Sequence, residues 1–253
     1  VDIKYFSLIP FDNVILVEDT LKALGDIARF IREHSNVKVV GVTGSVGKTS
    51  TKDMIYSVVS TKYKTLKTLG NYNNHLGLPL TIFRYNDENV MILEMGMNHL
   101  GEISYLTNIA KPDIAVITNV GTAHIGELGS RENILKAKME IVEGLNDNGT
   151  LIINGDNDML STVKEEGYVL KKVGIDCDSS LKVKDVILNE TYSTFTLCLD
   201  KDYDVYVPIA GTHFVLNALV AIQVGLSLDI SIEDCIKGVK SFTLTKNRND
   251  IIE

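Results

Sequence analysis

The chain has 253 residues, of which 25 are Lys or Arg and 33 are Asp or Glu, so its formal net charge at pH 7 is −8. Hydrophobic residues make up 45% of the sequence and charged residues 23%, which are fractions typical of globular proteins and exclude wholesale disorder. The acidic balance argues against a nucleic-acid-binding protein, because a phosphate backbone binds clustered cations. It does not exclude a nucleotide, whose phosphates need only a loop and one lysine.

Three cysteines, Cys177, Cys198 and Cys235, are far apart and form no C-x-x-C pair. This spacing predicts neither a disulfide framework nor a zinc site. No segment approaches the roughly 20 apolar residues of a membrane span, and the N-terminus lacks the basic start and the cleavage site of a signal peptide. We therefore expect reduced cysteines, a cytoplasmic location and no membrane insertion.

Residues 1–36 are predicted to hold one helix, because the apolar residues between Thr20 and Arg32 recur at helical spacing. From residue 37, short unbroken apolar strands alternate with helices, which is typical of a parallel sheet covered by helices on both faces. The expected strands are 37–42, 90–93, 114–118 and 150–154. One expected helix begins at Lys48, and two others cover residues 101–110 and 131–145.

From residue 169 the sequence alternates polar and apolar residues, with Asp-rich connections, which predicts a small antiparallel sheet. Its expected strands are 169–173, 183–188, 194–199 and 203–209. Helices 213–226 and 232–239 follow, the second with Ser231 as its N-cap. The predicted fold class is therefore α/β, with a P-loop-type, mostly parallel sheet flanked by helices and a small antiparallel β subsheet.

The strongest motif lies between the first predicted strand and its helix and has the spacing G-x-x-G-K-T. Amide groups of such a loop point into one concavity, and the helix N-terminus adds a positive dipole end. The lysine can reach the phosphates and the threonine hydroxyl can bind Mg²⁺. The alternative is a glycine-rich turn with a solvated lysine, but the strand before and the helix after favour a nucleotide site. The candidate residues are Thr43, Gly44, Ser45, Val46, Gly47, Lys48, Thr49 and Ser50.

Glu94 ends the second apolar strand and His124 follows the third. The carboxyl ends of parallel strands line the ligand crevice, and a carboxylate there can hold Mg²⁺. Taken alone, each residue would be expected to face solvent. Lys138 lies on the apolar stripe of the helix 131–145, whereas Lys136 faces outward. A lysine on an inward face must be desolvated, neutralised or modified. The alternative is that it snorkels, with its aliphatic chain packed on the apolar surface and its ammonium in solvent.

Four segments together resemble the ATP-dependent Mur ligases of peptidoglycan synthesis. They are 43–50, the run Gly-Asn-Tyr-Asn-Asn-His-Leu-Gly-Leu-Pro at 70–79, the run Glu-Met-Gly-Met-Asn-His-Leu-Gly-Glu-Ile at 94–103, and 123–141. The resemblance covers roughly residues 13–253. Within the family it is strongest to the member that adds D-alanyl-D-alanine to UDP-N-acetylmuramoyl-tripeptide. One departure is Ile125-Gly126, where the family more often has Leu-Glu.

The resemblance implies ATP and Mg²⁺ as cofactors and assigns three catalytic residues, Lys48, His124 and Lys138. Lys48 and Thr49 would bind the triphosphate and the first Mg²⁺, with Glu94 as a second ligand of that ion. His124 would bind a second Mg²⁺. Lys138 matches a family lysine that is carbamylated, and its carbamate would help to place that second ion.

Weaker matches concern the adenine of ATP and the acceptor peptide. His213 and Asn217 match a helix near the adenine, although alone they are typical of a helix start and a polar core residue. Arg248 matches an arginine in the linker to the family's last domain and would lie near the nucleotide. Asn73 and Asn74 are candidates for holding the acceptor peptide or the γ-phosphate.

The resemblance also implies the organisation of the chain and its chemistry. Residues 1–36 would be a remnant of the N-terminal domain and its linker, residues 37–253 the central ATP-binding domain, and the C-terminal domain would be absent. We expect a monomer that forms an amide through an acyl phosphate. The alternatives are another ligase of the superfamily, such as folylpolyglutamate synthase, and an isolated nucleotide-binding module without turnover.

Overall fold

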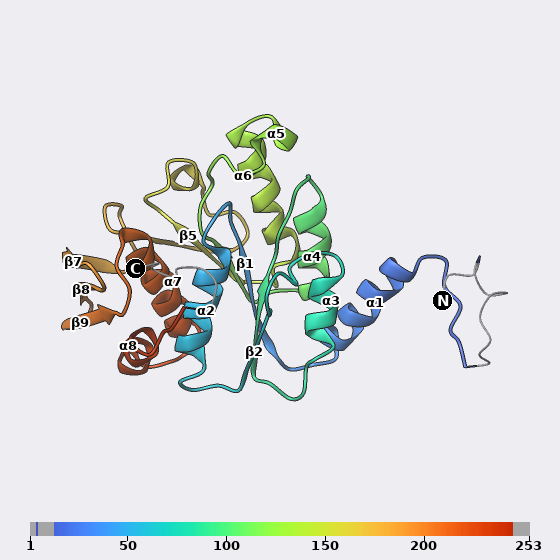
Figure 1. Cartoon of the computed structure of the whole chain (residues 1–253), viewed down its shortest axis with the longest axis horizontal. Helices are drawn as coiled ribbons and strands as arrows, with labels where there is room; N and C mark the ends of the chain where they lie inside the picture. Colours follow the sequence, from blue (N-terminus) through green and yellow to red (C-terminus); the bar gives the residue numbers. More distant parts are fainter. Residues whose placement is uncertain (1–3, 5–12, 245–253) are drawn as a thin grey trace, which may run out of the picture.

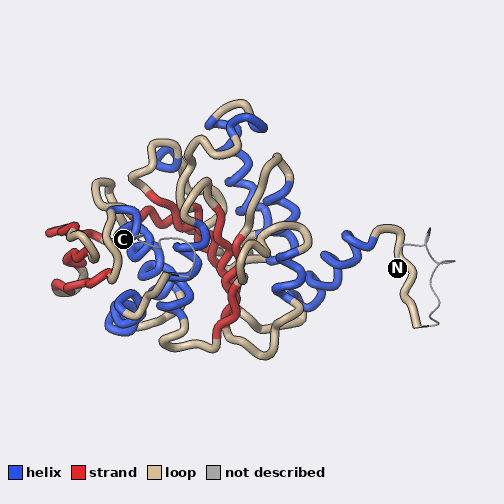
Figure 2. The backbone as a smooth tube through the Cα atoms, viewed as in Figure 1, coloured by secondary structure: helices blue, strands red, loops and turns tan. Residues whose placement is uncertain are grey.

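The computed structural model describes residue 4 and residues 13–244. Its main sheet has six parallel strands in the order β2-β3-β1-β4-β5-β6 (Figures 1 and 2). Their bounds are β1 Lys38–Thr43, β2 Thr65–Lys67, β3 Val90–Glu94, β4 Ile114–Ile117, β5 Thr150–Asn154 and β6 Val169–Val173. Because all six run the same way, their last residues meet at one edge of the sheet, which we call the carboxyl edge.

Helices cover both faces of this sheet, as unbroken apolar strands require. On one face lie α2 (Lys48–Val59), α7 (Thr212–Ser227) and α8 (Ile232–Lys240), and on the other α1 (Thr20–Glu33), α3 (Gly77–Ile82), α4 (Glu102–Ala110) and α6 (Arg131–Met139) (Figure 1). The short α5 (Ile125–Leu128) lies beyond the carboxyl edge. Alternate residues of β1 enter the two cores: Val40 and Val42 pack with α2 and α7, and Val39 with α1 and α4.

A second sheet, β7 (Lys182–Leu188), β8 (Ser193–Cys198) and β9 (Asp202–Val207), is antiparallel and packs on α7 and α8. It confirms the predicted α/β fold with a small antiparallel subsheet. One strand was assigned to the wrong sheet: 169–173 is β6, and it pairs in parallel with β5. Its pattern alternates because β6 is the last strand of its sheet, where burial is incomplete, and not because its neighbours run antiparallel.

Most other predicted elements are confirmed within one or two residues. Three were missed: β2 has only three residues, α3 has six and contains Pro79, and α5 has four. The predicted helix 131–145 continues beyond Met139 as a 3₁₀-helix, Glu140–Gly144. A second 3₁₀-helix covers Leu160–Thr162.

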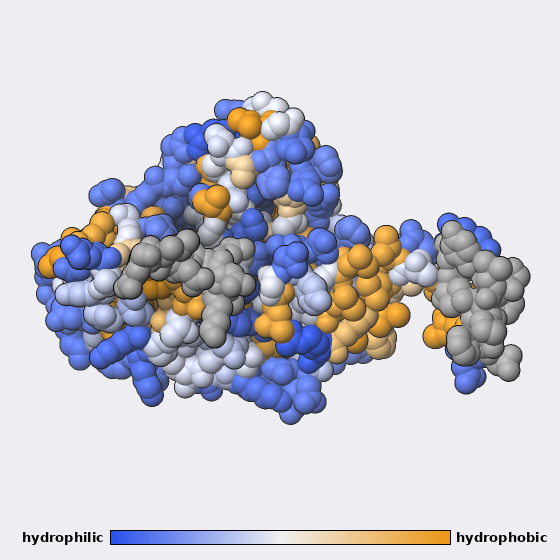
Figure 3. Space-filling view, viewed as in Figure 1, coloured by the Kyte–Doolittle hydropathy of each residue, from blue (hydrophilic) through white to orange (hydrophobic). Residues whose placement is uncertain are grey.

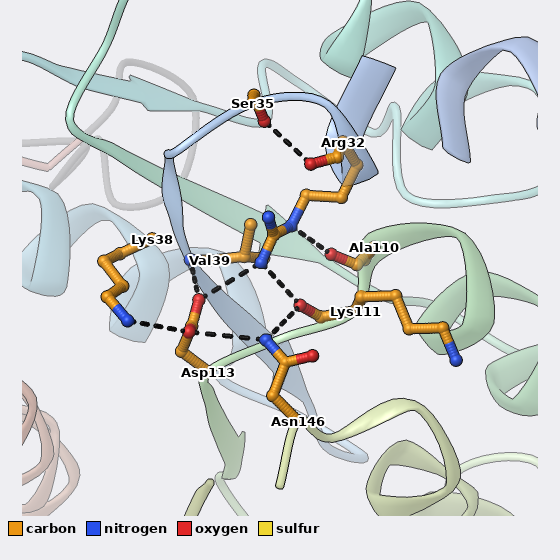
Figure 4. A network of polar contacts seen from close by, with 8 residues as sticks. All are labelled: Arg32, Ser35, Lys38, Val39, Ala110, Lys111, Asp113 and Asn146. Atoms are coloured by element: carbon orange, nitrogen blue, oxygen red, sulfur yellow. Dashed lines mark hydrogen bonds and ion pairs between the residues drawn. The ribbon is translucent and has the colours of Figure 1, made fainter. Parts of the chain in front are cut away.

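Helix α1 is attached to the opposite, amino edge of the sheet by a network of polar contacts around the buried Arg32 (Figure 4). Arg32 is 7% exposed and donates to the carbonyl oxygens of Ala110 and Lys111, both at 2.9 Å. Its guanidinium also lies 3.2 Å from the Asp113 carboxylate. We call Arg32, Asp113, Lys38 and Asn146 the amino-edge cluster.

The surface of α1 remains partly apolar. Leu21, Ile27 and Phe30 are 44%, 53% and 60% exposed, and apolar residues gather over this helix in Figure 3. The helix begins at Thr20 because the Asp19 side chain accepts from the amides of Leu21 and Lys22. No helix within residues 13–244 combines the length and apolar character needed to cross a bilayer.

Candidate active site

The predicted phosphate loop connects β1 to α2 at the carboxyl edge. Gly47 precedes α2 with φ +80°, a left-handed conformation that glycine adopts without a steric penalty. The first turn of α2 directs its amides and the positive end of its dipole into the loop. The Lys48 ammonium donates to the carbonyl oxygen of Gly44 at 2.8 Å. A lysine folded over its own loop in this way can reach an anion bound there.

The loop after β4 lies against the phosphate loop. The Ser45 amide donates to the backbone oxygen of Asn119 at 3.0 Å, and the Gly121 amide donates to Ser45 Oγ at 3.0 Å. Gly44 has no room for a side chain, because a Cβ at this position would overlap Thr118 Oγ1. The close approach of these two loops therefore depends on Gly44.

Glu94 is 2% exposed at the end of β3, so the alternative of a solvent-facing glutamate is wrong. Thr49 Oγ1 donates to its Oε2 at 2.9 Å, and Asn73 Nδ2 donates to its Oε1 at 2.9 Å. Thr49 and Glu94 thus present a hydroxyl and a carboxylate from α2 and β3 at one point. Oxygen ligands of this kind are those that Mg²⁺ prefers.

Two lysines, the buried Lys52 and the half-buried Lys67, were not predicted to belong to this site. Lys52 is 2% exposed, with its Nζ 3.7 Å from Glu94 Oε2 and 3.5 Å from Asp53 Oδ1. Lys67 Nζ lies 2.8 Å from Asp53 Oδ1 and 4.2 Å from the centroid of the Tyr56 ring. We call Lys52, Asp53, Lys67 and Glu94 the carboxyl-edge cluster. The available signal was that Lys52 and Asp53 follow the phosphate loop at the start of a helix that packs in the core.

Lys138 is 1% exposed, as its position on the apolar stripe predicts, whereas Lys136 is exposed. Burial, and to a smaller extent the positive charge of Lys48, lower the pKa of Lys138 to about 7. The same interaction shows that α6 brings this amine close to the phosphate loop. A substantial fraction of Lys138 is therefore the neutral, nucleophilic amine near pH 7.

His124 directly precedes α5, half-buried, with φ +66°. Its loop is held from α6 and from the end of β5, because Arg131 Nη2 and Asn157 Nδ2 donate to the Val120 carbonyl at 2.8 and 3.3 Å. Within residues 13–244, no three His, Cys, Asp or Glu side chains form a group arranged to hold a metal ion. Any ion here would need the Thr49 hydroxyl, a modified lysine or phosphate oxygens as further ligands.

The residues matched to the adenine region are less clearly placed. Asn217 is 8% exposed, and its Oδ1 accepts from Thr51 Oγ1 at 2.9 Å, which joins α7 to α2. His213 is exposed and its ring packs on Phe214, with centroids 4.2 Å apart. Arg248 lies outside the residues that the structure describes. Contacts of these residues with a nucleotide stay predictions.

Asn73 lies beside Glu94, whereas its neighbour Asn74 makes different contacts. Asn73 donates to Glu94, whereas Asn74 Oδ1 accepts from the amides of Leu76 and Gly77 at the start of α3. Asn74 also lines a cavity of about 450 Å³ between α1, α4 and the loop that precedes α3. The remaining lining residues are Asp19, Leu21, Lys22, His75, Gly96, Leu100, Gly101, Glu102, Tyr105 and Leu106.

Comparisons with known proteins identify the family of the chain. The Mur ligase middle domain matches residues 42–225. The UDP-N-acetylmuramoyl-tripeptide–D-alanyl-D-alanine ligase of Bacillus subtilis is 42% identical over 241 residues, which are 95% of this chain and 52% of that protein. The chain thus spans about half the length of the curated relatives it matches.

Solved structures give the same result. MurF from Acinetobacter baumannii superposes with a TM-score of 0.87 at 34% identity, covering 94% of this chain and 54% of that one. MurF ligase from Thermotoga maritima in complex with ADP gives 0.85 at 31% identity, covering 94% and 56%. A folylpolyglutamate synthase–AMPPCP complex, at 16% identity, a TM-score of 0.73 and coverage of 92% and 70%, shares the fold alone.

Proposed function

Because the chain belongs to the Mur ligase family, we propose that it is the ATP-binding part of a ligase that adds D-alanyl-D-alanine to UDP-N-acetylmuramoyl-tripeptide in the bacterial cytoplasm. The support is the identity of 42% to a ligase of that name, far above the 16% to folylpolyglutamate synthase. In this proposal residues 37–253 form the central ATP-binding domain, and residues 1–36 form a segment that belongs with the N-terminal domain and its linker.

ATP binds at the phosphate loop in this proposal. The first turn of α2 and the Lys48 ammonium neutralise the triphosphate, which the dipole and the charge of these groups favour. The related ligase from Thermotoga maritima was solved in complex with ADP, which supports the binding of a nucleotide in this proposal. His213, Asn217 and Arg248 remain the candidates for the adenine side.

The oxygen atoms of Thr49 and Glu94 fit Mg²⁺, since they converge at 2.9 Å from two different elements. His124 and a carbamylated Lys138 are the proposed ligands for a second ion. Bound Mg²⁺ would supply positive charge between two anionic reactants. The buried, partly neutral Lys138 amine suits carbamylation, because only the neutral amine attacks CO₂ and the resulting carbamate removes the cost of a buried ammonium.

The proposed reaction has two steps. The terminal carboxylate of the tripeptide attacks the γ-phosphate of ATP, which gives an acyl phosphate and ADP. The amine of D-alanyl-D-alanine then attacks that carbonyl and expels phosphate. Lys48 stabilises the charge that develops on the transferred phosphoryl group, and Asn73 and Asn74, beside Glu94 and the adjoining cavity, are the candidates for holding the acceptor peptide or the γ-phosphate.

The observation that carries the proposal is the position of Lys138, 1% exposed and close enough to Lys48 to have its pKa lowered by that charge. A solvated lysine on a structural helix would show neither property. The test uses the full-length ligase that contains this chain, assayed for phosphate release with both substrates. Lys138→Ala is expected to lose activity and to regain part of it when a short carboxylic acid is added to replace the carbamate.

Lys136→Ala is the matched control, because it removes an exposed lysine from the same helix and should leave activity unchanged. Full activity of Lys138→Ala would show that the lysine has only a structural role. Nucleotide binding without phosphate release by the unaltered full-length protein would favour the alternative of a binding module without turnover.

A further inference from the structure

Val46 lies between Ser45 and Gly47 in the phosphate loop. Its side chain is 61% exposed and therefore does not anchor the loop by packing. Gly47 follows it with φ +80°, and Gly44, two residues before it, has φ +152°. Glycines on both sides leave the backbone free to adopt many conformations. Something other than the loop's own side chains must therefore fix the orientation of the Val46 peptide groups.

Two consecutive side chains at the end of β4 do this. Thr118 Oγ1 donates to the Val46 carbonyl at 2.7 Å, and Asn119 Oδ1 accepts from the Val46 amide at 2.9 Å. Both polar backbone groups of one residue are thus held from a neighbouring strand. Thr118 is itself 9% exposed, and its amide donates to the Thr43 carbonyl at 3.0 Å, as a continuation of the β1–β4 pairing.

The segment that holds Val46 is in turn fixed on its other side. The carbonyl of Val120 accepts from Arg131 at the start of α6 and from Asn157 after β5. Residues 118–120 therefore lie between the phosphate loop and the helix that carries Lys138, and His124 follows four residues later. A preorganised loop binds phosphate without the entropic cost of ordering it at the moment of binding.

We infer that Thr118 and Asn119 are positioning residues, whose side chains hold the Val46 peptide groups so that the phosphate loop is ready for the β- and γ-phosphates of a nucleoside triphosphate. Neither side chain needs to touch the nucleotide for this role. The inference rests on the proposed function, because it takes the loop to be a nucleotide site, and it adds two residues that the phosphate-loop motif does not contain.

The test measures ADP and AMP binding to this chain by isothermal titration calorimetry. Thr118→Val removes one donor with little change of shape, and Asn119→Ala removes the acceptor. Each is expected to weaken ADP binding about five- to tenfold, the equivalent of one lost hydrogen bond. AMP binding should change by less than about twofold, because AMP has no β-phosphate for the loop to hold.

Asn108→Ala is the matched control, because it removes a side chain of the same type from α4, where it contacts the Ser104 carbonyl and Lys111, and leaves both Val46 contacts and the segment 118–120 intact. It should bind ADP like the unaltered chain, and thermal unfolding should show that all three variants are folded. Equal ADP binding by the unaltered chain, Thr118→Val and Asn119→Ala would overturn the inference alone. Failure of the unaltered chain to bind ADP would overturn the proposed function, and this inference with it.

Discussion

The two edges of the main sheet each hold a cluster of charged side chains with at least one buried member, and the clusters differ in what their members contact. In the amino-edge cluster, Arg32 donates to two backbone carbonyls, and Asp113 accepts from the Val39 amide at 2.9 Å. In the carboxyl-edge cluster, the Glu94 carboxylate contacts the side chains of Thr49, Asn73 and Lys52. Backbone groups thus take part in the first cluster, whereas the contacts given for the Glu94 carboxylate in the second come from side chains.

This difference teaches how to separate structural from functional buried charge. Burial does not distinguish the clusters, because Arg32 and Asp53 are both 7% exposed. Backbone groups are partners of both Arg32 and Asp113 and tie the amino-edge cluster to the main chain, although Asp113 also contacts the side chains of Arg32, Lys38 and Asn146. The side-chain partners of Glu94 can reorient when a cation takes their place, which suits a site that binds and releases ions. Perturbed or buried charges alone would have marked both edges as candidate sites.

The largest expected effect comes from changing an acid to its amide in the carboxyl-edge cluster. Glu94→Gln should weaken binding of a nonhydrolysable ATP analogue in the presence of Mg²⁺ about 100-fold, because the amide lacks the charge that an ion requires. Without Mg²⁺ the loss should be much smaller. Titration calorimetry with and without Mg²⁺ measures the difference.

Asp113→Asn is the control at the other edge. It should lower the free energy of unfolding by about 2 kcal/mol, because Arg32 and Lys38 lose a charged partner, with no change in nucleotide affinity. If Asp113→Asn weakened Mg²⁺-dependent binding as much as Glu94→Gln does, the distinction between the two clusters would be wrong.

The sequence predicted the fold well where a hydrophobic pattern has only one structural explanation. The order of strands and helices from β3 to β5 follows from unbroken apolar runs, and the inward face of Lys138 follows from helical spacing. The prediction failed for β6, where incomplete burial at the edge of a sheet imitates the alternation of an antiparallel strand. It missed β2, α3 and α5 because elements of three residues, of six that include Pro79, or of four carry too little periodicity to detect.

The candidate site was predicted in part for the same reason. Glu94 and the phosphate loop lie in sequence next to the strands that present them, so motif and position identify them together. Lys52, Lys67 and Asn119 were missed because their roles come from contacts between segments distant in sequence. Lys52 meets Glu94 across α2 and β3, and Asn119 meets Val46 across two loops. No local pattern encodes such pairs.

A smaller effect should appear when stability is measured against pH. The pKa of Lys138 is about 7 in the folded chain, lowered by burial and then by Lys48, from an ordinary value of 10.5. Between these values the unfolded chain holds more protons, so stability should rise with pH, by roughly 1.5 kcal/mol between pH 7 and 8.5. Urea unfolding of the unaltered chain in CO₂-free buffer should show this rise, and Lys138→Met should lack it.

The same experiment separates the two edges. Burial lowers the pKa of Arg32 too, but an arginine stays charged throughout this range, so the amino-edge cluster contributes no such slope. Parallel stability curves for the unaltered chain and Lys138→Met would contradict the assignment of the rise to Lys138.

The smallest effects concern the outermost lysine of each cluster. Lys67 contacts Asp53, which is 7% exposed, and lies over the Tyr56 ring, so Lys67→Met should lower the free energy of unfolding by about 1 kcal/mol. The Lys38 side chain is 62% exposed beside an Asp113 that keeps Arg32 and the Val39 amide, so Lys38→Met should cost no more than about 0.5 kcal/mol. Urea unfolding of both variants at low and high salt measures the contrast. A larger loss of unfolding free energy for Lys38→Met than for Lys67→Met would contradict this order. It would mean that the solvent exposure of a lysine does not indicate how much its ion pair contributes to stability.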